Sequence, residues 1–235
     1  MAPESSPPPL LAALLDLDGT LVDSIPDLAH AANAMRVELG MPPLGLDVLA
    51  TFVGKGMDNL VRRTLAGTLL NGEPDAALFT QGRASFRHHY GLINGDKATV
   101  YDGVVEGLRT MQDQGLQLAV VTNKPTEFTG PLLARTGLAG FFPVIVCGDT
   151  CARRKPDPDQ VLHACDRLGV PPAQAVMIGD SMNDALAGRA AGTRVLAVPY
   201  GYNEGQDVRT LDVDGIVPRL TDAAQVIARW NAAAG

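Results

Sequence analysis

Short β-rich runs alternate with segments of helical periodicity through the second half of this 235-residue chain. Such alternation is typical of βαβ units, in which parallel strands form a sheet that helices cover on both faces. We therefore expect an α/β fold with a Rossmann-like parallel sheet. After an apolar run at 10–15, the strand candidates lie at 117–122, 144–147, 175–178 and 194–198.

Residues 24–93 carry helical spacing without strand signals. Apolar residues recur at steps of three and four from Leu28 to Leu39 and again from Val61 to Leu69. A helical block therefore interrupts the α/β pattern just after its first strand. We expect an α/β catalytic core at 9–23 and 94–235, an all-helical cap at 24–93 and a disordered Pro/Ser-rich leader at 1–8.

Polar residues follow several of the expected strands at the point where each strand ends. In a doubly wound sheet, the carboxyl ends of the strands form one edge, and ligands bind there. Residues far apart in the sequence are therefore expected to meet at this edge. They are Asp16, Asp18, Gly19, Thr20, Thr122, Asn123, Lys155, Asp180 and Asp184.

These residue types suit phosphoryl transfer. In a pair such as Asp16 and Asp18, one carboxylate can attack phosphorus while the other carries a proton. Crowded carboxylates raise one another's pKa unless a cation lies between them, and an all-oxygen ligand set favours Mg²⁺. Lys155 and the Thr122 hydroxyl are candidates for binding the phosphoryl group against the metal.

Each of these residues also has an ordinary structural explanation when it is taken alone. Asp180 suits a helix N-cap and Asp184 the first turn of a helix, while Lys155 fits a solvated loop. Their joint occurrence at strand ends, in this order, favours a functional site.

Composition narrows the partners and the location. The net charge of −7 argues against nucleic acid but is compatible with a small anionic phosphate ester, because a metal and local basic residues can dominate a site. No apolar run has the roughly 18 residues of a membrane span, so no membrane partner is expected. With three cysteines and no signal-peptide pattern, we expect a cytoplasmic protein, either a monomer or a homodimer.

Four segments of the chain, at 16–20, 121–123, 155–156 and 179–184, resemble the ordered motifs of the haloacid dehalogenase-like phosphatase superfamily. This resemblance implies that Asp16 attacks phosphorus to form an aspartyl-phosphate. Asp18 is implied to protonate the leaving alcohol and then to deprotonate the hydrolytic water.

The resemblance also implies a set of ligands. Mg²⁺ would be bound by the Asp16 side chain, the Asp18 backbone carbonyl and the Asp180 side chain. Asp184 would support the metal site or orient Lys155. The residues implied to bind phosphoryl oxygens are Thr122, Asn123 and Lys155.

A second set of segments, at 21–24, 53–56, 122–126 and 200–203, is similar to phosphoglycolate phosphatases within the superfamily. The implied reaction is the Mg²⁺-dependent hydrolysis of 2-phosphoglycolate to glycolate and phosphate. Pyrophosphate, a sugar phosphate or a phosphomutase reaction remains an alternative, because related enzymes share parts of this pattern.

Two residues depart from the pattern of that family. Lys55 lies between Gly54 and Gly56, where the cap loop commonly reads Gly-Asn-Gly, and Met182 stands where arginine is common. The resemblance places this loop opposite the phosphate site. Lys55 or the loop amides are therefore candidates for binding the substrate carboxylate, with Arg62 or Arg63 as weaker candidates.

Two other classes of protein fit less well. A phospho-accepting signalling module would be shorter, would lack a cap and would leave Asp18 without a role. A dinucleotide-binding module needs Gly-x-Gly-x-x-Gly after the first strand, and Gly19 begins no such run.

Overall fold

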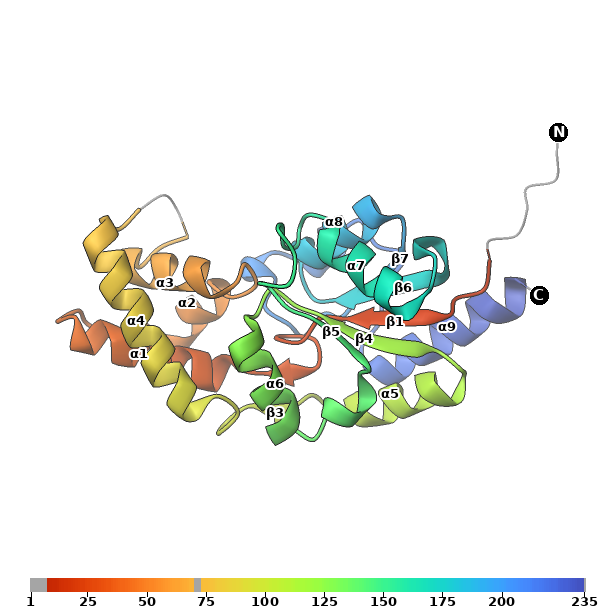
Figure 1. Cartoon of the computed structure of the whole chain (residues 1–235), viewed down its shortest axis with the longest axis horizontal. Helices are drawn as coiled ribbons and strands as arrows, with labels where there is room; N and C mark the ends of the chain where they lie inside the picture. Colours follow the sequence, from red (N-terminus) through yellow and green to blue (C-terminus); the bar gives the residue numbers. More distant parts are fainter. Residues whose placement is uncertain (1–7, 70–72, 235) are drawn as a thin grey trace.

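The computed structural model describes residues 8–69 and 73–234, and its centre is a six-stranded parallel sheet (Figure 1). The strands are β1 (Ala12–Leu15), β4 (Gln117–Val121), β5 (Val144–Val146), β6 (Ala175–Gly179), β7 (Arg194–Ala197) and β8 (Gly215–Ile216). Their order is β5-β4-β1-β6-β7-β8, so β1 lies between β4 and β6. Leu15 pairs with Val120 and with Ile178, which aligns the carboxyl ends of these three strands.

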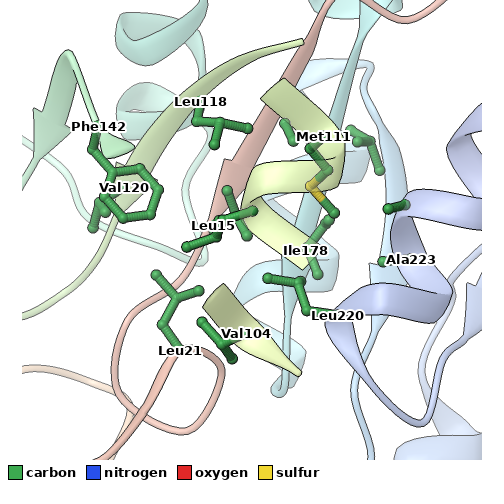
Figure 2. Packing of buried hydrophobic residues seen from close by; sticks show 14 of the residues in the cluster. Leu15, Leu21, Val104, Met111, Leu118, Val120, Phe142, Ile178, Leu220 and Ala223 are labelled. Atoms are coloured by element: carbon green, nitrogen blue, oxygen red, sulfur yellow. The ribbon is translucent and has the colours of Figure 1, made fainter. Parts of the chain in front are cut away.

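Alternate residues of β1 face opposite sides of the sheet, as a period of two requires. Ala13 and Leu15 pack with helices α5 (Val104–Asp113), α6 (Thr126–Arg135) and α9 (Leu220–Ala234). Ala12 and Leu14 pack with α7 (Asp159–Leu168) and α8 (Met182–Ala191). Figure 2 shows the first of these layers, where Leu15 and Ile178 lie against α5 and α9. Burial of each such leucine contributes about 1.5–3 kcal/mol, so both layers fix the position of β1.

A second group of helices lies beside the sheet, drawn in red to yellow in Figure 1. Two short antiparallel strands, β2 (Val22–Asp23) and β3 (Thr99–Val100), pair where the chain enters and leaves this group. The helices share a hydrophobic cluster that includes Met35, Phe52 and Phe86. They are α1 (Ile25–Glu38), α2 (Leu46–Thr51), α3 (Met57–Ala66) and α4 (Ala76–Ile93).

The α/β class and the parallel sheet expected from the sequence are confirmed. The first strand begins at Ala12 rather than at residue 10, because the residue pairs with both neighbouring strands start at Ala12. The strands β2, β3 and β8 have two residues each, too few for a periodic pattern to reveal.

Other expectations stay predictions. The cap and core bounds are proposals, and the expected leader at 1–8 lies outside the described residues except for residue 8. Across the described part of the chain, no helix has both the length and the apolar character needed to cross a membrane. The cytoplasmic location and the monomeric or homodimeric state are still predictions from the sequence.

Candidate active site

Asp16 and Asp18 lie at the carboxyl end of β1, where the chain turns away from the sheet. The Asp16 backbone N–H donates to the Ile178 carbonyl at 3.0 Å, so Asp16 is still fixed by the strand. Gly19 follows with a φ of 91°. A Cβ at this position would lie 2.5 Å from Oδ2 of Asp180, so only glycine leaves room for that carboxylate.

Asp180 and Asp184 follow β6 and begin helix α8. Asp180 accepts a hydrogen bond from the Thr20 hydroxyl at 2.9 Å and another from the Tyr202 backbone N–H at 2.7 Å. Asp184 and Ser181 form a capping box, in which Oδ2 of Asp184 accepts from the Ser181 hydroxyl at 2.7 Å and from its N–H at 3.1 Å. The requirements of a helix start therefore hold Asp184 at the site.

The ammonium of Lys155 lies between two of these carboxylates and is buried. It donates to Oδ1 of Asp184 at 2.6 Å and to the Val121 carbonyl at 2.6 Å. It also forms an ion pair with Asp16, whose Oδ1 lies 2.9 Å away. Both oxygens of Asp184 thus have partners, which favours the orientation of Lys155 as its role.

The electrostatics of the cluster favour a divalent cation. Asp16, Asp180 and Asp184 offer oxygens that lie within 4.8 Å of one another. Burial raises the pKa of Asp16 to about 7; the nearby Asp184 carboxylate also raises this pKa, while the Lys155 ammonium lowers it. Burial and the two neighbouring carboxylates also raise the pKa of Asp180. Three carboxylates and one ammonium leave two negative charges, and the all-oxygen donor set fits Mg²⁺.

Thr122 and Asn123 follow β4 and are buried at the same edge. The Thr122 hydroxyl oxygen accepts from the backbone N–H of Lys124 at 3.2 Å. The Asn123 side-chain amide donates to the carbonyls of Gly54 and Lys155, each at 2.9 Å. Asn123 therefore joins the helical group to the core, and its role in binding phosphoryl oxygens stays a prediction.

Lys124 is buried at the site, although it was not among the residues that the sequence motifs predicted to act there. Its ammonium lies 3.0 and 3.1 Å from the two carboxylate oxygens of Asp18, and it donates to the Tyr90 hydroxyl at 2.7 Å. The Ser24 hydroxyl donates to the same carboxylate at 2.6 Å. Lys124 and Ser24 fall within segments similar to phosphoglycolate phosphatases, and that similarity was the available signal.

The cap loop reaches the site through its glycines. Gly54 and Gly56 line a cavity of about 40 Å³ that Asp16 and Asp18 also line. The Lys55 ammonium instead pairs with Glu204 at 3.0 Å, and Arg63 pairs with the same carboxylate at 2.9 Å. The structure thus brings the loop to the carboxylates of the site, but it does not bring the Lys55 ammonium into the cavity lining.

Comparison with known proteins gives a consistent set of relatives. The family model described as haloacid dehalogenase-like hydrolase matches residues 13–198. A protein of Thiobacillus denitrificans named phosphoglycolate phosphatase is 49% identical over 226 residues, covering 96% of this chain and 99% of its own. A protein of Nitrosospira multiformis with the same name is 46% identical over 221 residues, covering 94% and 97%.

The solved structures include a similar fold from Haemophilus somnus 129PT, described as a predicted phosphoglycolate phosphatase. Its TM-score is 0.85 and its sequence identity 31%, with 92% of this chain and 97% of that chain covered.

Proposed function

This chain is a phosphatase of the haloacid dehalogenase-like hydrolase family, and from that premise we propose that it hydrolyses 2-phosphoglycolate to glycolate and phosphate. One observation carries the proposal: two carboxylates at the end of β1 have different partners. Asp16 pairs with Lys155, whereas Asp18 pairs with Lys124, and both carboxylates line the cavity. The names of the two bacterial relatives support the same substrate.

Different partners allow the two carboxylates to divide the chemistry. Asp16 attacks phosphorus, the ester P–O bond breaks, and an aspartyl-phosphate forms on Asp16. Asp18 in its protonated form gives a proton to the leaving oxygen, and as a carboxylate it later takes one from the water that attacks phosphorus. The bond between Asp16 and phosphorus then breaks, which releases phosphate and restores the Asp16 carboxylate. Lys155 orients Asp16 and offers positive charge to the phosphoryl oxygens.

The metal belongs to the same proposal. Mg²⁺ would be held by the side chains of Asp16 and Asp180 and by the backbone carbonyl of Asp18. When bound, the ion supplies positive charge that reduces the repulsion between Asp16 and the anionic phosphate. Asp184 acts as a positioning residue, since its oxygens accept from Lys155 and Ser181.

The lining of the cavity favours a leaving group with an apolar carbon. Leu28, Leu60 and Phe128 line the cavity and match a methylene better than the polar oxygens of pyrophosphate.

A substrate panel tests this function. We expect the highest kcat/KM for 2-phosphoglycolate, ahead of pyrophosphate and hexose phosphates. Chelation with EDTA should stop turnover and Mg²⁺ should restore it, while Asp16→Asn should abolish turnover in a folded protein. A higher kcat/KM for a sugar phosphate would replace the substrate, and turnover by Asp16→Asn would refute the mechanism.

A further inference from the structure

Lys124 provides the cationic side chain of the cavity lining. Among the described residues that line the cavity, Lys124 is the only one with a cationic side chain. Only 3% of this side chain is exposed, and its ammonium contacts Asp18 and the Tyr90 hydroxyl. It also lies 4.8 Å from the centre of the Tyr90 ring. Burial of an ammonium is costly, so its retention in a largely apolar cavity requires an anionic partner.

Three cations of the helical group have carboxylate partners, and the exposed Arg154, which donates to the Lys55 carbonyl at 3.5 Å, lies outside the cavity lining. Lys55 and Arg63 share Glu204, and Arg62 lies 3.4 Å from Glu73. The ammonium of Lys55 is also on a side chain that is 40% exposed. A substrate anion would have to displace Glu204 from Lys55 or Arg63 outside the cavity, whereas at Lys124 it would displace the Asp18 carboxylate inside the cavity.

The distance between Lys124 and Asp18 matches the spacing of the proposed substrate. An acid that protonates the ester oxygen must lie within about 3 Å of it. In 2-phosphoglycolate, two covalent bonds separate that oxygen from the carboxylate carbon, a span of about 2.4 Å. A cation 3.0 Å from the Asp18 carboxylate is therefore within reach of the substrate carboxylate.

We propose that Lys124 binds the substrate carboxylate and so determines the preference for carboxylated substrates, an inference that rests on the proposed function. Without substrate, the carboxylate of Asp18 occupies this position. With substrate, the carboxylate of the glycolyl group takes its place beside the ammonium, while Ser24 still donates to Asp18. The Tyr90 hydroxyl, 2.7 Å from the ammonium, keeps Lys124 in place during the exchange.

The test compares three lysine-to-methionine variants on two substrates, 2-phosphoglycolate and ethyl phosphate, which has the same two-carbon length without the carboxylate. In Lys124→Met, the ratio of the two kcat/KM values should fall by about 10–100-fold, the range for a hydrogen bond to a charged group. Lys97→Met, which alters an exposed lysine, is the matched control and should leave both values unchanged. Lys55→Met tests the alternative cation.

Each outcome has a distinct meaning. If the wild type shows no preference for 2-phosphoglycolate, the proposed function fails and the inference fails with it. If the wild-type preference persists in Lys124→Met, or if Lys55→Met removes it instead, only the inference about Lys124 is refuted. Equal losses on both substrates would show that Lys124 merely positions Asp18, and would also refute the inference.

A second pair of variants covers the case in which Lys124→Met does not fold because Asp18 loses its cation. The two proteins are Asp16→Asn/Asp18→Asn and the same protein with Lys124→Met. Neither has the Asp18 carboxylate, so the loss of Lys124 leaves no buried negative charge without a cation at this position. Calorimetry with 2-phosphoglycolate should show about 10–100-fold weaker binding when Lys124 is absent. Equal affinities for the two proteins would refute the assignment.

Discussion

Replacement of Lys155 by methionine tests whether this ammonium is the main protein group that neutralises the acidic cluster. The side chain is 1% exposed, and it pairs with Asp16 at 2.9 Å and with Asp184 at 2.6 Å. Loss of one partner of a buried ion pair typically costs about 3–5 kcal/mol, because the remaining charge stays buried. For a chain of 235 residues, at about 2–4 °C per kcal/mol, Tm should fall by about 6–20 °C.

Thermal unfolding with and without Mg²⁺ measures this effect. In EDTA, we expect the full loss of stability in Lys155→Met. Added Mg²⁺ should recover part of it, and should raise the Tm of the variant more than that of the wild type, because the variant carries one more uncompensated negative charge. The exposed Lys97→Met is the control for the loss of a lysine.

A third variant separates charge from packing. Adding Asp184→Asn to Lys155→Met removes one of the two stranded carboxylates while leaving an oxygen that can accept from Ser181. The double variant should be more stable in EDTA than Lys155→Met alone. The electrostatic reasoning is wrong if Lys155→Met unfolds at the wild-type temperature in EDTA, or if Asp184→Asn gives no recovery.

Three other perturbations have definite expected results. Ser24→Ala removes the 2.6 Å hydrogen bond to Asp18 and should lower kcat by about 10–100-fold with little change in KM. A wild-type kcat in steady-state kinetics would contradict this prediction. In Gly201→Ala, the new Cβ would lie 2.2 Å from Oδ2 of Asp180 and would displace that carboxylate. The Mg²⁺ concentration for half-maximal activity should therefore rise by about 10-fold or more. An unchanged Mg²⁺ titration would argue against Asp180 as a ligand. Partial burial raises the pKa of Glu204, but hydrogen bonds from Lys55 and Arg63 outweigh it and lower the pKa below the ordinary 4.5. The stabilising contribution of Glu204 is therefore present above about pH 4.5 and lost as the pH falls through the lowered pKa. Glu204→Gln removes the charge at any pH and should speed hydrogen exchange at 53–56 at pH 7. Exchange equal to that of the wild type would exclude this link.

The edge of the sheet was predictable from the sequence because its determinants are local. Each long strand carries its own apolar run, and parallel strands must bring their carboxyl ends to one edge. The approach of Asp16 to Asp180 follows from that rule once β1 and β6 are neighbours. The position of Asp184 follows in the same way from the capping of α8.

The contacts between the helical group and the core were not predictable in this way. Lys124 and Tyr90 of α4 are 34 positions apart, and Lys55 and Glu204 are 149 positions apart. These pairs depend on how α1–α4 are oriented beside the sheet, which no local pattern encodes. From the sequence, Lys124 beside Pro125 is expected to be a solvated turn residue, but in the structure the ring of Tyr90 covers its ammonium.

Tyr202 connects the proposed metal ligand to the point where the chain enters the helical group. Its N–H donates to Asp180 at 2.7 Å, while its hydroxyl donates to Asp23 at 2.6 Å and accepts from the Ser24 N–H at 2.9 Å. If the ion at Asp180 favours one orientation of the helices that follow Ser24, thermodynamic linkage makes the effect mutual. A ligand that stabilises the same orientation would then tighten the binding of the ion by the factor by which the ion tightens the binding of that ligand. The enzyme would therefore retain the proposed metal most firmly while its pocket is filled.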